Sequence, residues 1–338
     1  MSKLFVAARG VALIALSALL AGGAVAAPPY NLTLSGASPG GLWSTVGAAF
    51  NASVAAAYPG STITYQTSGG GLANAQLLAD NKVPIAIIND FELLTAVQGA
   101  EPFKAPIKDL RVVVRGYPAS ARFQMLHLLL TKSFAEQHGI KSLDDLKAKK
   151  PPLRMALNRR GNLDVKLGEY AMQELGIGLK DIESWGGQVV YAASGEQAKL
   201  MANRRIDMLN IALSVRHRAI QEAANAVELV AFGLTEPQAK AVAEKVGGQV
   251  CPITKKDYEY LVADSLSVCQ GGVIAANASL PDEIAYDLAK AAHTQIDKYK
   301  AAHRVFEQSI TPEKLVESAA APYHPGALKY YREAGLVK

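Results

Sequence analysis

Two glycine-rich loops, each between a strand pattern and a helix pattern, are the segments of this sequence best suited to bind a ligand. The first covers residues 38–41 (Ser-Pro-Gly-Gly) and the second residues 68–71 (Ser-Gly-Gly-Gly). Backbone N–H groups at the start of a helix, aided by the helix dipole, favour an anionic group such as a carboxylate. Together the loops predict an anion site, although tight-turn geometry alone would explain either loop taken singly.

A third loop, residues 158–162, follows another strand pattern and reads Asn-Arg-Arg-Gly-Asn. The guanidinium group of Arg159 or Arg160 can form paired hydrogen bonds with a carboxylate. We expect one of these two side chains to face the ligand. The alternative is that both are solvated or paired with acidic residues at the rim.

Other polar and aromatic residues lie close to the ends of predicted strands. Asn89 follows a short buried strand and can both donate and accept hydrogen bonds, while Asp90 is a candidate helix cap. Trp43 is either a wall of the site or part of the core, and Ser214 is a weaker candidate at the end of a later strand. The predicted ligand-binding residues are Ser38, Gly40, Gly41, Trp43, Ser68, Gly69, Gly70, Asn89, Arg159, Arg160, Asn162 and Ser214.

Motifs of metalloproteases and nucleotide-dependent enzymes are missing from the sequence. It has no His-Glu-x-x-His pair and no Walker-type Gly-Lys-Ser/Thr. Glu169 and Glu174 share a helix pattern, but their spacing does not place them on one face. We therefore expect a binding protein without catalytic residues or a cofactor, with an enzyme as the less favoured alternative.

The N-terminus has the pattern of a secretory signal peptide, with basic residues, an apolar run over residues 11–20 and the small-x-small sequence Ala24-Val25-Ala26. Cleavage after Ala26 would leave 312 of the 338 residues, enough for about two domains. Loss of Lys3 and Arg9 lowers the net charge from +5 to +3, which does not favour a nucleic-acid binder. We expect an exported, periplasmic protein.

Cys251 and Cys269 are the only two cysteines. Their spacing and the absence of a nearby His do not fit a zinc site, and the six His are scattered, so we expect no bound metal. Export to an oxidising compartment makes a disulfide reasonable. Two separate buried thiols are the alternative, because sequence does not give the Cα separation.

The elements that position the loops alternate between strands and helices. Strand patterns at residues 31–35, 61–67 and 153–157 each lead through one of the loops into a helix pattern. This alternation predicts an α/β protein with parallel sheets covered on both faces. Towards the C-terminus, a loose region from residue 232 to residue 252 precedes a return strand and two long helices, residues 281–301 and 311–318.

The whole chain after the leader resembles the TAXI family of solute-binding receptors for tripartite (TRAP) transporters. Residues 324–335, His-Pro-Gly-Ala-Leu-Lys-Tyr-Tyr-Arg-Glu-Ala-Gly, resemble the terminal signature of that family, and residues 38–41 resemble its first ligand loop. The resemblance implies a type II periplasmic-binding-protein fold, with two α/β lobes, crossing hinge strands and a ligand cleft between them. The implied division is residues 27–122 plus 273–338 for lobe 1 and residues 123–272 for lobe 2.

The resemblance also implies a small, carboxylate-bearing or amino-acid-like ligand and membrane TRAP permease subunits as partners of a monomeric receptor. A sensor subunit that reports to a membrane kinase is the alternative. Asn74 matches the family pattern and joins the predicted ligand residues. However, Gly70-Gly71-Leu72-Ala73-Asn74 replaces the common Gly-Ser-Val-Glu-Asn, and Gly161-Asn162-Leu163-Asp164 replaces Gly-Ser-Gly-Thr, so ligand identity does not transfer.

Overall fold

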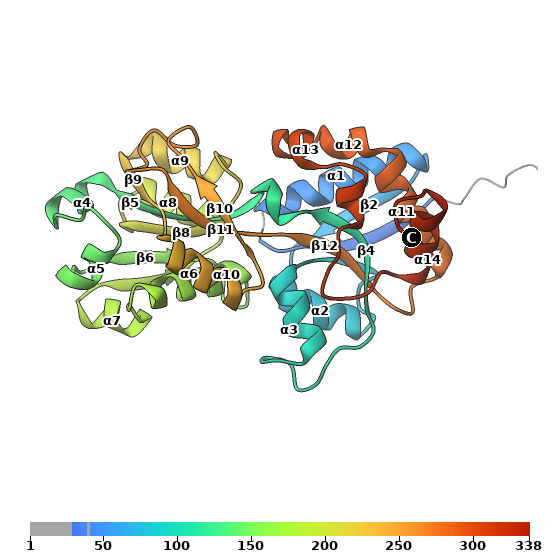
Figure 1. Cartoon of the computed structure of the whole chain (residues 1–338), viewed down its shortest axis with the longest axis horizontal. Coiled ribbons are helices and arrows are strands. Elements are labelled where there is room, and N and C mark those ends of the chain that lie inside the picture. The colour runs from blue at the N-terminus through green and yellow to red at the C-terminus, as the bar shows by residue number, and fades with distance from the viewer. Residues whose placement is uncertain (1–28, 39–40) are drawn as a thin grey trace, which may run out of the picture.

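The computed structural model describes residues 29–38 and 41–338, which fold into two α/β lobes lying side by side (Figure 1). The first lobe contains a sheet with strand order β2-β1-β3-β12-β4. Its strands are β1 (Asn31–Ser35), β2 (Thr62–Gln66), β3 (Ile85–Asn89), β4 (Leu110–Tyr117) and β12 (Gly272–Asn277). Its helices are α1 (Leu42–Ala57), α2 (Gly71–Ala79), α3 (Asp90–Gln98), α11 (Asp282–Thr294), α12 (Ile296–Lys300), α13 (Arg304–Ser309) and α14 (Pro325–Glu333). The predicted leader, residues 1–26, lies outside the described residues.

The second lobe contains a sheet with strand order β10-β11-β5-β8-β6-β7, in which β9 also pairs with β5. Its strands are β5 (Gln124–Thr131), β6 (Arg154–Leu157), β7 (Gln188–Tyr191), β8 (Met208–Leu213), β9 (Leu229–Phe232), β10 (Gln249–Ile253) and β11 (Ser265–Gln270). Its helices are α4 (Lys132–Gln137), α5 (Asp144–Lys149), α6 (Leu163–Glu174), α7 (Leu179–Ser184), α8 (Ser194–Ala202), α9 (Arg218–Ala226) and α10 (Glu236–Lys245).

Two segments of the chain connect the lobes. The first passes from β4 to β5 through a 3-10 turn (Ala119–Ala121), and the second passes from β11 to β12 through Gly271. Strand β11 pairs with the start of β5, and Gly272 pairs with Tyr117 at the end of β4. The two connections therefore run beside each other as a pair of crossing strands.

Both sheets are mixed, which corrects the prediction of parallel sheets. Strand β1 is parallel to β2 and β3, and β6 is parallel to β7 and β8, as the strand–helix alternation predicted. Strand β12 is antiparallel to both of its neighbours, and β5 is antiparallel to β8, β9 and β11. These two strands enter their sheets from the connections between the lobes, so they run in the opposite direction.

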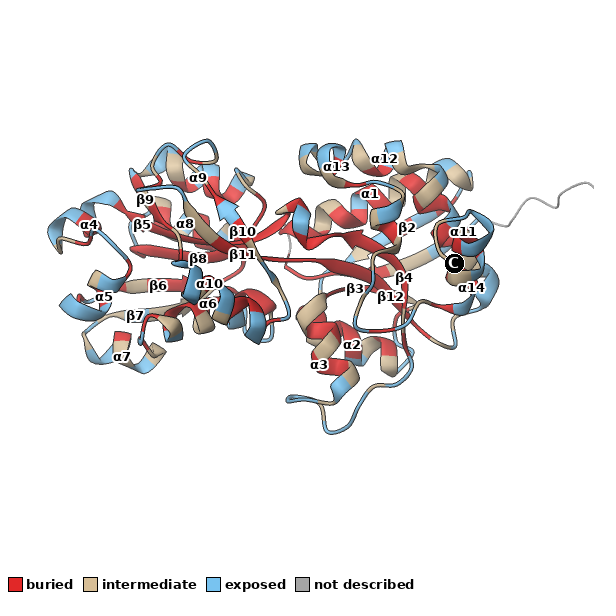
Figure 2. Cartoon of the chain, viewed as in Figure 1, coloured by how far each residue is buried: buried red, intermediate tan, exposed pale blue. Residues whose placement is uncertain are grey.

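The central strands carry the core of each lobe. Every residue of β3, β5 and β12 is buried, and helices cover both faces of the two sheets (Figure 2). A strand buried on both faces is expected to be almost continuously apolar, as the sequence Ile-Ala-Ile-Ile of β3 is. Within residues 29–38 and 41–338, no helix has the length and apolar character required to cross a bilayer.

The prediction of two long helices near the C-terminus is wrong. Within residues 281–301 the helix is interrupted at Gln295, whose φ of −110° and ψ of 30° separate α11 from α12. Within residues 311–318 only a 3-10 turn (Glu313–Val316) forms. The hydroxyl of Tyr323 donates to carbonyl oxygens of this segment, which a continuing α-helix would have used itself.

The C-terminal signature has a structural role in the first lobe. Nδ1 of His324 accepts a hydrogen bond from the backbone N–H of Gly326 and caps α14. A Cβ atom at Gly326 would lie 1.9 Å from the carbonyl oxygen of Asp282, so only glycine lets α14 approach the start of α11 this closely. The hydroxyl of Tyr331 donates to the carbonyl of Val113 in β4 at 2.9 Å.

The predicted loose region from residue 232 to residue 252 is instead ordered as α10 and β10. Strand β10 pairs antiparallel with β11, and a disulfide bond joins Cys251 of β10 to Cys269 of β11. Of the two alternatives left open by the sequence, the structure therefore contains the disulfide. It lies in the strand pair that leads back towards the first lobe.

We expect the disulfide to stabilise the second lobe. Closing a loop of 18 residues lowers the entropy of the unfolded chain and corresponds to about 3 kcal/mol. The Cys251→Ser/Cys269→Ser double variant should therefore unfold at a lower urea concentration than the oxidised protein, by about that free energy. Two freely titrating thiols in the unreduced, denatured wild-type protein would contradict this assignment.

Candidate functional site

A small cavity lies between the lobes, next to the ends of β1, β6 and β8. Its volume is about 20 Å³, which is about room for one water molecule. The residues that line it come from both lobes: Ala37, Ser38, Gly41, Leu42, Trp43, Gln124, Asn158, Asn162, Asp164, Ser194, Ala212 and Leu213. This is where ligands bind in open α/β sheets, because the loops that follow the carboxyl ends of the strands meet there.

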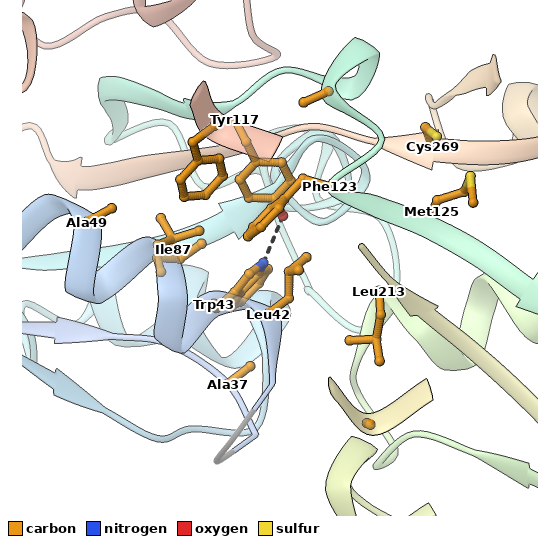
Figure 3. Close-up of a cluster of buried hydrophobic side chains, with 14 of the residues drawn as sticks. Ala37, Leu42, Trp43, Ala49, Ile87, Tyr117, Phe123, Met125, Leu213 and Cys269 are labelled. Carbon is orange, nitrogen blue, oxygen red and sulfur yellow. Dashed lines mark hydrogen bonds between the residues drawn. The ribbon is translucent and has the colours of Figure 1, made fainter. Parts of the chain in front are cut away.

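The first lobe contributes the first glycine-rich loop and the start of α1. Gly41 is the N-cap of this helix of 16 residues and leaves it without a side-chain cap. The hydroxyl of Ser38 is 3.4 Å from Oδ1 of Asn158, to which it donates across the cleft. Indole Nε1 of Trp43 donates to the hydroxyl of Tyr117 at 2.8 Å (Figure 3). Gly41, Leu42 and Trp43 at the start of α1 therefore line the cavity.

A chain of hydrogen bonds continues from Trp43 into the second lobe. The hydroxyl of Tyr117 donates to Oε1 of Gln124 at 2.7 Å, and Nε2 of Gln124 donates to Oδ1 of Asp164 at 3.3 Å. Gln124 is the first residue of β5, directly after the connection between the lobes. These hydrogen bonds connect Trp43 of the first lobe to the carboxyl group of Asp164 in the second lobe.

Asp164 is the only ionisable residue among the described residues that line the cavity. Its side chain lies in the first turn of α6 and is buried, with 3% of the residue exposed. It also accepts hydrogen bonds from Nδ2 of Asn158 at 2.9 Å and from the backbone N–H of Ala212 at 3.4 Å. Burial raises the pKa of Asp164 to about 6, while these donors lower it. The group can accept a hydrogen bond from an ammonium or hydroxyl group of a ligand.

A second buried carboxyl group, that of Glu92 in α3, lies at the interface of the lobes outside the cavity lining. Burial raises its pKa to about 8, the charge of Asp164 adds to the rise, and backbone N–H donors oppose it. Asn89 and Glu92 form a reciprocal capping box at the start of α3. Asn89 is therefore the cap of this helix, and Asp90 pairs with Arg115 instead.

Four of the predicted ligand residues, Ser38, Gly41, Trp43 and Asn162, line the cavity. Asn162 also caps α6, since its Oδ1 accepts from the backbone N–H of Asp164 at 3.2 Å. Gly40 lies outside the described residues.

The second glycine-rich loop packs against the other lobe. A Cβ atom at Gly70, whose φ is 109°, would lie 3.2 Å from the carbonyl oxygen of Gly161. The hydroxyl of Ser68 donates to the carbonyl of Gly36 and accepts from the N–H of Gly70, which fixes the loop that contains Gly69. Gly69 and Gly70 therefore lie against Gly161 of the other lobe, and Ser68 holds their loop within the first lobe.

Asn74 and Ser214 are buried away from the cavity lining. The side chain of Asn74 donates to the carbonyls of Ser35, Gly36 and Ile87 and accepts from the hydroxyl of Ser35, so it ties α2 to β1 and β3. Among the described residues, the hydroxyl of Ser214 has no hydrogen-bond partner.

The two arginines of the third loop are exposed at the rim. The guanidinium of Arg160 stacks on the ring of Tyr191, with 3.8 Å from Cζ to the ring centroid. Arg159 is likewise exposed, and its backbone N–H donates to Oδ1 of Asn158. Neither lines the cavity, and contact of either guanidinium with a ligand stays a prediction.

Sequence reasoning missed Gln124, Asn158, Asp164 and Ser194. Asn158 was visible as the first residue of the third loop. Asp164 resembles any acidic residue in the first turn of a helix, where it complements the dipole. Its carboxyl group is held by Gln124, Asn158 and Ala212, which come from distant parts of the chain, and the local sequence contains no signal for these contacts.

Residues 36–40 match the pattern Gly-x-Ser-x-Gly between β1 and α1. An acyl-transfer site would require a base beside the serine hydroxyl. The partner of Ser38 is the amide of Asn158, and the described residues that line the cavity include no histidine. The geometry therefore fits hydrogen bonding to a ligand. The described residues also contain no cluster of His, Cys, Asp and Glu that could hold a metal ion.

Comparison with known proteins identifies the family. The model of the NMT1-like family matches residues 34–335, so the chain belongs to this family. Malate-bound MatC from Rhodopseudomonas palustris has 15% sequence identity and a TM-score of 0.55, over 92% of this chain and 100% of MatC. The periplasmic binding protein BugD has 11% identity and a TM-score of 0.55, over 92% and 99% of the two chains.

PhnD1 from Prochlorococcus marinus, solved with methylphosphonate, has 11% identity and a TM-score of 0.52, over 91% of this chain and 100% of PhnD1. At such low identity these similarities show the fold. The protein has the type II periplasmic-binding-protein fold that the resemblance to TAXI receptors implied.

The two buried carboxyl groups should make stability depend on pH. Because the folded state raises the pKa of Glu92 from its usual 4.5 to about 8 and that of Asp164 from 3.8 to about 6, it keeps protons that the unfolded chain has already released. The free energy of unfolding should therefore fall as pH rises through these windows.

Glu92→Gln should remove the part of this fall that extends to about pH 8, and Asp164→Asn the part that ends near pH 6. Urea unfolding at a series of pH values measures both slopes. Three identical pH profiles for the wild type and the two variants would refute this account.

Proposed function

We propose that this protein is an exported solute-binding protein that captures a small polar ligand between its lobes and delivers it to a membrane transporter. The observation that carries the proposal is the convergence of buried polar groups from both lobes on one cavity. These groups include the hydroxyl of Ser38, the amides of Gln124 and Asn158, and the carboxyl of Asp164. Buried polar groups of this kind are costly unless they are hydrogen-bonded, and a ligand can complete their bonding.

The chemistry of the cavity favours an amino-acid-like ligand. Asp164 is suited to accept hydrogen bonds from an ammonium group. The start of α1 beside Gly41 and the start of α8 at Ser194, both without a side-chain cap, are suited to a carboxylate. A zwitterion would satisfy both kinds of group at once, whereas a ligand with only anionic groups would leave Asp164 without a counter-charge.

Entry of such a ligand requires the lobes to separate. The residues that line the cavity come from both lobes, so a ligand reaches it from between them. The two connections, at the 3-10 turn Ala119–Ala121 and at Gly271, are the segments at which a hinge motion would occur. We propose lobe 1 as residues 27–122 plus 273–338 and lobe 2 as residues 123–272, moving as rigid bodies.

The transport partner that best fits the sequence is a TRAP permease. The order of the ligand loops and the C-terminal sequence of residues 324–335 resemble those of TAXI receptors. The leader pattern of residues 1–26 and the periplasmic binding proteins among similar structures support a periplasmic location. In this role the protein acts as a monomeric receptor without catalytic activity.

The proposal predicts saturable binding of a small amino acid or related compound, detected as a thermal shift and quantified by calorimetry. Asp164→Asn should weaken binding of an ammonium-bearing ligand by about 2 kcal/mol or more, roughly 30-fold, because a buried charge pair loses one partner. Glu169→Gln removes a carboxylate from the same helix outside the cavity and is the matched control. No thermal shift with any amino acid, dicarboxylate or other small anion at millimolar concentration would refute the proposal.

A further inference from the structure

The carboxyl group of Glu92 bridges two helix starts that belong to different lobes. Its Oε1 accepts a hydrogen bond from the backbone N–H of Gly71, the first residue of α2, at 3.2 Å. The same oxygen accepts from the N–H of Leu163, the first residue of α6, also at 3.2 Å. Glu92 and α2 belong to the first lobe and α6 to the second, so one oxygen atom joins the lobes.

The surroundings of this carboxyl group leave no room for another anion. A Cβ atom at Gly71 would lie 1.9 Å from Oε2 of Glu92, and Gly70 packs against Gly161 of the opposite loop. Only 1% of Glu92 is exposed, and the side-chain amide of Asn89 donates to Oε2. The second and third loops therefore meet around a carboxyl group that the protein itself provides.

We propose that Glu92 is a positioning residue that holds the lobes closed by occupying the anion site between the starts of α2 and α6. The sequence predicted that N–H groups of the second glycine-rich loop bind a ligand carboxylate. One of them, the N–H of Gly71, instead donates to Glu92. The anionic end of a ligand is directed to the first loop and α1, next to Asp164. Glu92 thus acts through the arrangement of the lobes and makes no contact with the ligand.

The closing contact depends on a hydrogen-bond acceptor and does not require a charge. Oε1 can accept from Gly71 and Leu163 whether or not the carboxyl group is protonated, and the side-chain oxygen of glutamine could do the same. An alanine at position 92 would leave both N–H groups without this acceptor in the closed arrangement. Opening would allow water to bind them, so the loss of the acceptor favours the open form.

Small-angle X-ray scattering of the ligand-free mature chain tests the proposal, with removal of ligand checked by native mass spectrometry. Glu92→Ala should give a larger radius of gyration than the wild type, and Glu92→Gln should retain the wild-type value. Sodium formate, which supplies the missing carboxylate, should return Glu92→Ala to the compact form. Sodium chloride at equal ionic strength is the control for formate.

A second pair of variants tests the same bond from the other lobe and does not depend on the folding of Glu92→Ala. Leu163→Pro deletes the donor N–H at the first helical position, where proline is tolerated. The preceding Asn162 has φ of −93° and ψ of 143°, which is compatible with a following proline. Leu163→Ala keeps the N–H while also shortening the buried side chain. Leu163→Pro should be more open than Leu163→Ala.

Three results would overturn the proposal. One is a radius of gyration that is the same for wild type, Glu92→Ala and Glu92→Gln. Another is an expansion of Glu92→Ala that formate does not reverse, and the third is equal scattering by Leu163→Pro and Leu163→Ala. The inference goes beyond the proposed function and concerns the ligand-free protein, so its failure would leave amino-acid binding and its dependence on Asp164 to be judged separately.

Discussion

The burial of two carboxyl groups where the lobes meet is the constraint on which the closed arrangement depends. A buried carboxyl group is costly unless polar partners surround it. Glu92 obtains partners from the starts of α2 and α6, and Asp164 obtains them from Gln124, Asn158 and the backbone of β8. Glu92 reaches one of these partners only when the lobes are together, and Gln124 lies directly beside the connection between the lobes.

The three loops therefore perform different tasks although they have similar positions at strand ends. The first loop and the start of α1 border the cavity. The second loop packs on the third, and Glu92 fills the anion position between them. Because the second and third loops pack on each other, a ligand is confined to the side of the cleft that the first loop borders. The lobes can therefore stay in contact around Glu92 while the cavity beside Asp164 remains available.

Local sequence was sufficient for three strand–loop–helix units and for the first loop. The strand–loop–helix units around β1, β2 and β6 follow from residue patterns within each segment, and Ser38, Gly41 and Trp43 lie in one of them. What the sequence could not show depends on contacts between lobes. From the local sequence, Glu92 is the N3 residue of a capping box, and the structure contains that box. Its hydrogen bond to Leu163 joins residues 71 positions apart, which local sequence does not indicate.

Contacts between distant segments also account for the direction of the crossing strands, which follows from the connections between the lobes, and for the interrupted C-terminal helices, which follow from packing within the first lobe. Helical periodicity continues across Gln295, but the buried position of Tyr299, whose hydroxyl bonds to the carbonyl of Gly116, requires the chain to turn there. Gly70 and Gly161 favour turns in the local sequence. Only the folded chain shows that they also allow the two lobes to approach closely.

The most direct test of the account is a crystal structure of the protein purified without refolding, with whatever ligand it retains. The account predicts one small ligand in the cavity bordered by Ser38, Asn158 and Asp164, with a donor group on Asp164 and Glu92 still bonded to Gly71 and Leu163. A ligand carboxylate between Gly71 and Leu163, with Glu92 displaced from them, would contradict it.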